Sequence, residues 1–323
     1  MVLREISILD IAGIRIAQTE DTGAATGCTV FICDKGMPAG LDVRGGGPAS
    51  RESQLLNPLM SAQCLHAIVL AGGSAFGLGA ADGVLQVLEA RGIGYEVGLT
   101  RVPLVAQSDL FDLAVGDPFT RPDADMGRKA ALLAFEAPNY RDGNYGAGCG
   151  ATVGKVAGMG RCMKSGIGSF ALETGALQVG AVAVVNALGD VVDWKNGRPV
   201  AGLRTEDGSA LADTVAHMAA SIRAVENRFT GNTTLAVVMT NAAFDKPRLC
   251  KIAGMAHDGF ARAIRPVHTS ADGDSIYAVS LGDVCADQDL VGTLAAQAVS
   301  EAILRAVQSA ESAYGLPSAR ELH

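Results

Sequence analysis

Thr233 is the residue whose type and position most directly suggest chemistry. A hydroxyl is a weak nucleophile that needs a base, and a threonine at a chain terminus carries that base as its own α-amine, with a pKa of about 7.7–8.0 in model compounds. Such a residue should precede a rigid strand, and Thr233 is followed by Thr234 and the apolar run LAVVM. Gly231 would let the backbone bend for self-cleavage after Asn232. By pattern alone, however, an ordinary strand that begins with threonine is the favoured interpretation.

Other segments approach known motifs but lack a residue that each motif requires. In GGSAFGLGAADG, Phe76 stands where a nucleophile elbow around Ser74 needs glycine. A dinucleotide-binding turn that begins at Gly77 would place the carboxylate of Asp82 against pyrophosphate. The five histidines show no metal-ligand spacing, and the Gly-Lys-Ser/Thr triplet of a phosphate-binding loop is missing. We therefore expect neither a metal nor an organic cofactor.

The composition indicates a globular protein of the cytoplasm. Hydrophobic residues make up 49% and charged residues 19% of the chain, which is enough for a large core. The formal net charge of −8 argues against nucleic acid as a partner. The seven cysteines are scattered without a CxxC pair, which disfavours disulfide and zinc frameworks. The sequence shows neither a signal peptide nor about 18 uninterrupted apolar residues, so we expect no membrane partner.

Apolar periodicity and glycine-rich turns predict the elements that would position Thr233. A strand, a glycine turn and a helix ending at Gly92 are expected from His66 onward, whereas the chain after Pro118 is expected to form loops. Residues 177–194 resemble a hairpin of two strands. Further strands are expected at 27–34, at 235–239 and in SIYAVS. Further helices are expected at 210–225 and from Pro247 to before Pro266. The last helix is expected to begin at about Asp289, with Gly315 and Pro317 as its stop signals.

The order of these elements indicates a layered α/β fold. The chain has no linker-like segment and no repeat, so residues 1–323 are predicted to form a single domain. Strands and helices are mixed along the chain, without a strict strand–helix–strand alternation. A sandwich of layers is therefore favoured over a doubly wound parallel sheet.

A set of longer segments resembles one family almost throughout. Together they are similar to the L-aminopeptidase/D-esterase family of self-processing peptidases, whose relatives include β-peptidyl aminopeptidases and nylon-oligomer hydrolases. The resemblance covers about the first nine-tenths of the chain and is specific as a set. The Asn-Thr-Thr and Asp-Gly-Asp forms are closest to the nylon-oligomer hydrolases and to uncharacterised bacterial peptidases, because better-known aminopeptidases use serine. The segments are IAGIRI, TGCTVFICD, GLDVRGGGPASRESQLLNP, AIVLAGGSAFGLGAADGV, RPDADMGR, GAGCGATVGK, VGAVAVVNALGDVVD, GNTTLAVVMTNA, AHDGFARAIRPVHT and DGDSIYAVS.

The resemblance implies both a fold and a processing event. The fold is an αββα sandwich like that of N-terminal-nucleophile hydrolases, with different connectivity. Self-cleavage between Asn232 and Thr233 would give fragments 1–232 and 233–323, which stay associated. Thr233 would be both the self-cleaving residue and the catalytic nucleophile, and its amine would serve as general base. Substrates would be small peptides, amides or esters, and the protein would assemble as a homotetramer or larger ring.

Four further residues match functional positions of this family. Asp272 and Asp274, in HTSADGDS, match an acidic pair that orients the nucleophile, and their spacing puts both side chains on one side of an extended segment. Asn186 matches the amide that helps to hold the oxyanion. Lys155 matches a cation near the nucleophile, where it would keep the hydroxyl and amine pKa values low. Taken alone, each residue would be interpreted as an ordinary turn or surface residue.

One departure from the family pattern and two alternative functions remain open at this level. Phe111 stands where nylon-oligomer hydrolases carry tyrosine, so a hydroxyl donor is missing and the oxyanion would depend more on Asn186 and on backbone N–H groups. The related ornithine acetyltransferases also cleave themselves before a threonine but pass the acyl group to an amine. A non-catalytic protein that binds small molecules on the same scaffold is the third interpretation.

Overall fold

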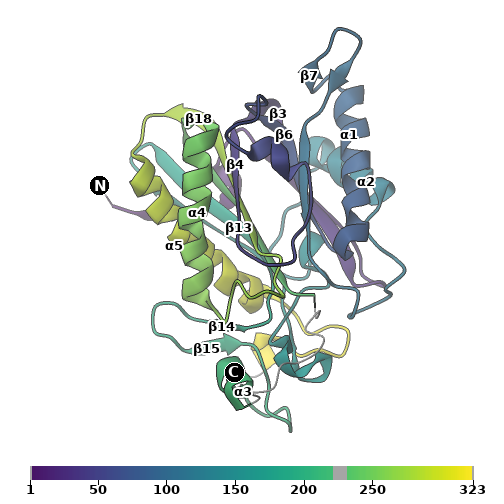
Figure 1. The fold of residues 1–323 in the computed structure, drawn as a ribbon, viewed down its shortest axis with the longest axis vertical. Coiled ribbons are helices and arrows are strands. Elements are labelled where there is room, and N and C mark those ends of the chain that lie inside the picture. The colour runs from purple at the N-terminus through teal and green to yellow at the C-terminus, as the bar shows by residue number, and fades with distance from the viewer. Residues whose placement is uncertain (1, 221–230, 322–323) are drawn as a thin grey trace.

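Two β-sheets lie face to face, and two helices cover the outer face of each (Figure 1). The computed structural model describes residues 2–220 and 231–321. The first sheet has the strand order β1 (Arg4–Ile6), β12 (Ile167–Thr174), β13 (Leu177–Asn186), β16 (Thr233–Ala242), β18 (Ser275–Val284) and β4 (Ala39–Val43). The second has the order β2 (Arg15–Asp21), β3 (Thr26–Met37), β6 (Leu65–Ala71), β9 (Val105–Asp109) and β5 (Ala49–Arg51).

The helices complete a four-layered sandwich. Helices α4 (Lys246–Ala263) and α5 (Gln288–Ser309) pack on the first sheet, and α1 (Ala80–Ala90) and α2 (Ala124–Glu136) pack on the second. Strand pairs β16–β18 and β6–β9 are parallel, and the other neighbours within the two sheets are antiparallel. The predicted αββα architecture is confirmed.

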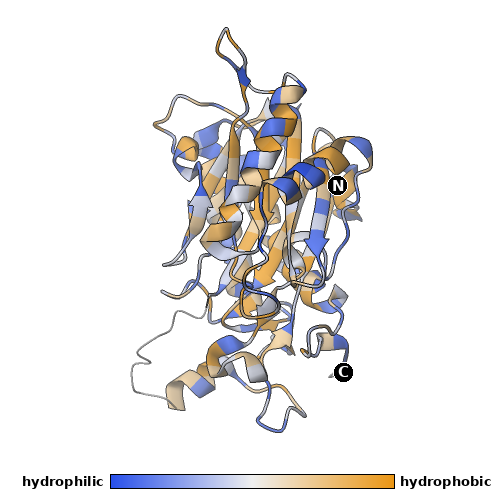
Figure 2. Ribbon diagram, turned by 90° about the vertical axis from the view of Figure 1, so that its right-hand side faces the viewer, coloured by the Kyte–Doolittle hydropathy of each residue, from blue (hydrophilic) through white to orange (hydrophobic). Residues whose placement is uncertain are grey.

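Three apolar layers hold the sandwich together. One fills the space between the sheets, and one lies between each sheet and its helices. Strand β16 shows why its sequence suits this position, because Leu235 and Val237 face the second sheet while Ala236 and Val238 face the helices. Side chains alternate across a strand, so a continuous apolar run is what a strand buried on both faces requires. Figure 2 shows the hydrophobic residues concentrated on the central strands.

The helix boundaries follow the expected capping chemistry. Asp123, Asp245 and Asp287 each accept a hydrogen bond from a backbone N–H in the first turn of α2, α4 and α5. Pro247 lies in the first turn of α4, as predicted. Helix α5 ends at Ser309, several residues before the glycine and proline that were expected to stop it. Among the described residues, α5 is also the one helix long and apolar enough to cross a membrane, and 78% of its apolar window is buried inside the protein.

Two sequence-based expectations were wrong, and a third is only partly testable. The segment after Pro118 contains helix α2, whose Gly127 and Ala130 allow close packing on α1, so its small residues form a helix rather than a loop. Residues 177–194 do not form a hairpin: β14 (Asp190–Val192) pairs with β15 (Pro199–Ala201) and β17 (Ile264–Arg265) in a separate sheet. Of the helix expected at 210–225, α3 (Thr214–Ala220) is observed, and the remainder lies outside the described residues.

The failed hairpin has a simple cause. Strand β13 is already flanked by β12 and β16, so neither of its edges is free for β14. The turn between β13 and β14 contains Gly189, where an added Cβ would lie 2.3 Å from the carbonyl oxygen of Pro266. The glycine therefore marks a close approach to a distant backbone segment rather than a tight hairpin turn.

Candidate active site

Strand register places Thr233 beside Asn186. Thr233 is the first residue of β16, Asn186 is the last residue of β13, and the two are directly opposite in the antiparallel pair. Both side chains point into the space between the sheets, since Leu235 and Val184, two residues further along each strand, belong to that core. Opposed residues of this kind have Cβ atoms about 4.5–5.5 Å apart. Thr233 is 5% exposed and Asn186 is fully buried.

The carbonyl group of Asn232 is held against the Thr233 hydroxyl. Thr233 Oγ1 donates a hydrogen bond to the Asn232 carbonyl oxygen over 2.5 Å. The backbone N–H of Gly273 donates to the same oxygen over 2.8 Å. An added Cβ on Gly273 would lie 2.6 Å from Thr233 Oγ1, so only glycine leaves room for the hydroxyl. The carbonyl group of the peptide bond between residues 232 and 233 therefore accepts from a backbone donor and from the hydroxyl of Thr233.

Gly231 sets the direction from which the chain enters this site. Its φ of 51° lies in the left-handed region that favours glycine. An added Cβ would lie 2.0 Å from Cγ of the Phe111 ring, so a larger residue would clash as well as strain the backbone. The glycine that the sequence suggested for bending therefore makes a sharp turn against Phe111.

Lys155 and Asn186 meet at the carbonyl oxygen of Gly231. Lys155 Nζ donates to this oxygen over 3.2 Å and to Oδ1 and the carbonyl oxygen of Asn186 over 2.8 and 3.0 Å. Asn186 Nδ2 donates to the Gly231 oxygen over 3.1 Å and to the Phe111 carbonyl oxygen over 2.9 Å. Thr152, through its N–H and hydroxyl, also donates to Asn186 Oδ1, which fixes the orientation of the amide. The structure thus brings the predicted lysine and asparagine together, one residue away from the bond expected to break.

Burial shapes the charge of Lys155. The side chain is 3% exposed, and desolvation lowers its pKa to about 7, although Cys162 and Asp272 oppose this shift. Burial therefore weakens the hold of Lys155 on its proton, whereas the three oxygen atoms that accept from Nζ favour the ammonium form.

The two predicted carboxylates lie close together but have different partners. Asp274 Oδ1 accepts the N–H of Thr234 over 2.7 Å, and its Oδ2 accepts from His268. Asp272 instead turns back to Thr269, whose N–H and hydroxyl donate to Oδ2 over 2.7 and 2.6 Å. Burial, together with the neighbouring charge of Asp274, raises the pKa of Asp272. Asp274 therefore contacts β16, the strand that begins with Thr233, directly, while Asp272 shapes the loop that carries both carboxylates.

A third carboxylate, which sequence reasoning missed, lies at the same place. Asp109 ends β9 of the second sheet and lines a small cavity of about 40 Å³ together with Thr233, Phe111 and Ser74. Asp109 Oδ1 accepts from Gln107 Nε2 over 2.7 Å, whereas its buried Oδ2 has no hydrogen-bond partner among the described residues. Burial raises the pKa of Asp109 well above its ordinary value. The only signal in the sequence was an acidic residue within the apolar stretch LVAQSDLFDL.

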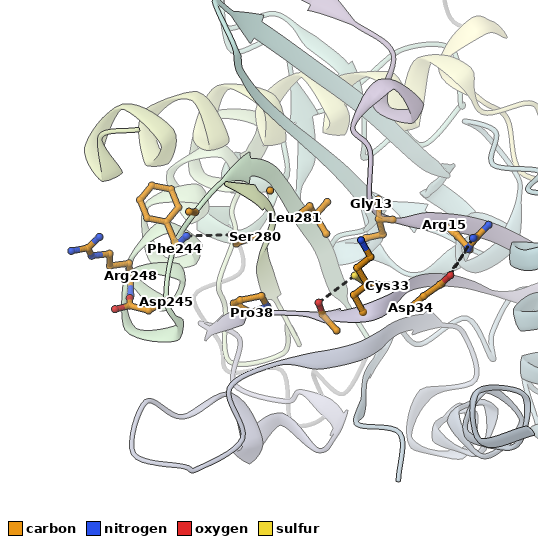
Figure 3. A pocket seen from close by; sticks show the side chains of 15 residues that line it. Gly13, Arg15, Cys33, Asp34, Pro38, Phe244, Asp245, Arg248, Ser280 and Leu281 are labelled. Atoms are coloured by element: carbon orange, nitrogen blue, oxygen red, sulfur yellow. Dashed lines mark hydrogen bonds and ion pairs between the residues drawn. The ribbon is translucent and has the colours of Figure 1, made fainter. Parts of the chain in front are cut away.

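A larger cavity of about 920 Å³ lies elsewhere (Figure 3). It is lined by residues that follow β16, such as Phe244, and by Ser280 and Leu281 near the end of β18. Strands rise about 3.3 Å per residue, so it lies about 30 Å from Thr233, at the opposite end of β16. Its charged side chains are partly paired, as in the Arg15–Asp34 ion pair. Size alone therefore does not mark the site at which the candidate nucleophile lies.

The fold defines the class of this protein. Its layers match the structure of the L-aminopeptidase D-Ala-esterase/amidase from Ochrobactrum anthropi, which is described as a new variant of the N-terminal-nucleophile hydrolase fold. The TM-score is 0.69 at 17% sequence identity, over 96% of this chain and 88% of the other. The chain belongs to peptidase family S58, whose family model matches residues 7–320, and it is a hydrolase.

Two relatives give the range of named activities. An uncharacterised aminopeptidase from Mycobacterium leprae is 37% identical, with 97% of this chain and 92% of the relative aligned. A 6-aminohexanoate-oligomer endohydrolase from a Kocuria species is 28% identical, with 94% of this chain and 87% of the relative aligned. The resemblance to self-processing aminopeptidases and nylon-oligomer hydrolases is thus confirmed at the level of the family.

Proposed function

We propose that this hydrolase cuts its own chain between Asn232 and Thr233, and that Thr233, as a new N-terminus, then hydrolyses amide bonds through an acyl-enzyme. The observation that carries the proposal is the contact of 2.5 Å between Thr233 Oγ1 and the carbonyl oxygen of Asn232, which also accepts from Gly273. The backbone donor itself is ordinary, because Asn232 and Asp272 pair in parallel register and buried carbonyl groups are normally hydrogen-bonded. What a structural threonine would not need is the contact of its hydroxyl with the preceding carbonyl and a glycine that leaves room for that hydroxyl.

Self-cleavage would proceed by an N-to-O acyl shift. Thr233 Oγ1 attacks the Asn232 carbonyl carbon and loses its proton, and the N–H of Gly273 stabilises the negative charge that develops on the oxygen. The C–N bond breaks as the nitrogen of Thr233 takes up a proton, which leaves an ester between the two residues. Water then hydrolyses the ester, releasing the carboxylate of Asn232 and the free hydroxyl and amine of Thr233.

Cleavage would also uncover the donors needed for turnover. In the continuous chain, Lys155 Nζ and Asn186 Nδ2 are both engaged by the carbonyl oxygen of Gly231. Once the new C-terminus at Asn232 withdraws, the same two donors can face the carbonyl oxygen of a substrate. Preorganised donors of this kind typically lower a barrier by about 3–4 kcal/mol each. The uncleaved chain would therefore be inactive for a second reason besides its missing amine.

In turnover, the amine of Thr233 would take the proton of its hydroxyl as Oγ1 attacks the substrate carbonyl. Asn186 and Lys155 would hold the oxyanion, and the departing amine would accept the proton. Water would then resolve the ester. The unpaired oxygen of buried Asp109 suits a substrate with a protonated amine near the scissile bond. We therefore favour short peptides and amides with a free amino group over substrates blocked at that end. The expected assembly remains a homotetramer or a larger ring.

Denaturing mass spectrometry of the purified protein tests the proposal. The wild type should give fragments 1–232 and 233–323, and Thr233→Val, which keeps the shape but removes the hydroxyl, should stay intact and lack amidase activity. Thr234→Val is the matched control, because its side chain lies on the other face of β16, and it should still cleave. An intact wild-type chain, or cleavage of the Thr233→Val variant, would overturn the proposal.

A further inference from the structure

The loop before β18 contains a histidine in an unusual conformation. His268 has a φ of 57°, in the left-handed region that few residues other than glycine adopt, although asparagine, aspartate and histidine do so more often than the rest. Its Nδ1 lies 2.8 Å from Asp274 Oδ2, and its backbone N–H donates to the same oxygen over 3.1 Å. The side chain and the backbone of this one residue therefore both reach a single carboxylate oxygen. Strain retained next to an active site is often connected with function.

We propose that His268 is a positioning residue for the nucleophile, acting through Asp274. The inference rests on the proposed function of Thr233. Asp274 uses one oxygen for His268 and the other for the N–H of Thr234, the residue bonded directly to Thr233. His268, Asp274 and Thr234 thus form a continuous chain of hydrogen bonds that ends one peptide unit from the reacting hydroxyl.

This connection matters more after cleavage than before it. In the continuous chain, Thr233 is held by the backbone on both sides. After cleavage it is a free terminus whose position depends on the N–H of Thr234 and on the pairing of β16 with β13. A carboxylate fixed in one rotamer by two donors from His268 would keep Thr234, and with it the nucleophile, in a single position. Loss of the histidine side chain would leave Asp274 Oδ2 with the backbone N–H of residue 268 but without the imidazole donor, so the carboxylate would be held less firmly. This loss would lower kcat more than it raises KM.

The surroundings of His268 fix its ring without competing for Asp274. His257 contacts the ring edge-on at a centroid distance of 4.8 Å, and Phe260 lies at 5.9 Å. His257 itself is anchored on β4, through the carbonyl oxygen of Asp42 at 3.0 Å. Since a carboxylate only accepts, Nδ1 of His268 is the donor in its contact with Asp274.

Two substitutions of His268 separate this positioning role from a merely structural one. His268→Gly removes the imidazole and tolerates the left-handed backbone. His268→Asn also tolerates that backbone, and its side-chain amide can place a donor where Nδ1 lies. We expect His268→Gly to reduce kcat by about 10- to 100-fold, the range typical of a hydrogen bond to a charged group, with KM changed by less than about twofold. The self-cleavage rate should fall as well, but by a smaller factor, because Thr233 is then still held by the backbone on both sides. His268→Asn should recover most of the loss.

His66→Ala is the matched control. It removes another buried imidazole whose Nδ1 is hydrogen-bonded, here to the N–H of Leu104 over 3.0 Å, but on the second sheet. This control should lower the melting temperature and leave kcat unchanged. Normal cleavage and kcat in His268→Gly would overturn the inference while leaving the proposed function intact. Equal losses in the Gly and Asn variants would also overturn it, because the hydrogen bond would then not be the cause. An uncleaved wild type would instead contradict the proposed function.

Discussion

Three carboxylates lie near Thr233, and their hydrogen-bond partners indicate a different role for each. Asp274 is engaged through both oxygens, by Thr234 and by His268. Asp272 is engaged by Thr269, in a local turn. Asp109 keeps one buried oxygen unpaired among the described residues and faces the cavity. A carboxylate whose hydrogen-bonding capacity is already used can position a neighbour, whereas one with an unused oxygen can bind a ligand.

This difference predicts the effect of Asp109→Asn. Removing the charge should raise KM for substrates with a free amine by about 10- to 100-fold, because a charge-assisted contact of about 1.5–3 kcal/mol is lost. Since burial raises the pKa of Asp109, the carboxylate gains its proton as the pH falls, and the KM of the wild type should rise towards acidic pH. Steady-state kinetics with an amine substrate between about pH 5 and pH 8 measures both effects.

The control for this prediction is the same substrate with its amine acetylated. Its KM should be equal in the wild type and in Asp109→Asn, because no ammonium is present to be bound. A similar loss for both substrates would mean that the substitution disturbs the cavity as a whole. Replacing an exposed carboxylate, as in Asp117→Asn, should leave the KM of both substrates unchanged.

The elements themselves were largely predictable where apolar periodicity is strong. The buried run after Thr233 and the stripe of α4 were both found in the sequence, since such patterns follow directly from burial. Helix α2 was missed because its glycine and alanines, which permit close packing on α1, weaken the apolar pattern. The pairing of Asn186 with Thr233, and the position of Asp109, depend on which strands become neighbours. Local sequence does not encode that choice.

Buried lysines tie loops to these elements in a way that the sequence did not indicate. Lys164, fully buried on β11 (Met163–Lys164), donates to the carbonyl oxygens of Gly148, Ala151 and Ser165, and so organises the glycine-rich loop that leads to Lys155. Burial lowers the pKa of Lys164 to about 7. Lys164 therefore holds three backbone carbonyl groups together in the interior, whereas most lysines are exposed on the surface.

The depressed pKa of Lys164 predicts how stability depends on pH. Between about pH 7 and the ordinary lysine pKa of about 10.4, the unfolded chain binds more protons than the folded chain, so the free energy of unfolding should rise with pH. The expected contribution is about 1 kcal/mol per pH unit for each such lysine. Urea titrations of uncleaved Thr233→Val at pH 7.0, 7.3 and 7.6, which stay about one unit below the ordinary thiol pKa of about 8.5, should show this rise.

Lys164→Met in the same background should be less stable at every pH, because it leaves carbonyl oxygens unpaired. Its free energy of unfolding should also rise less steeply with pH than that of the parent. Lys155 contributes to the remaining slope, since burial lowers its pKa to about 7 as well. Equal slopes in the two proteins would show that Lys164 does not titrate in this range.

At the scale of the whole molecule, the proposed cut falls in the middle of a sheet. Residues 233–323 would supply β16 and β18, which are neighbours at the centre of the first sheet, and the helices α4 and α5 that cover it. Residues 1–232 would supply β13 on one side of this pair and β4 on the other. The fragments would therefore share one sheet and one core, so cleavage need not open the molecule.

This arrangement predicts that the cleaved fragments behave as one folded unit until they unfold. They should elute together in native size-exclusion chromatography and separate only in denaturant. Because unfolding then also separates two chains, the melting temperature of the cleaved wild type should increase with protein concentration more steeply than that of Thr233→Val. Differential scanning calorimetry over a wide concentration range, with both proteins at the same oligomeric state, measures this difference. Fragments that separate under native conditions would show that β13 and β4 do not retain the strands between them.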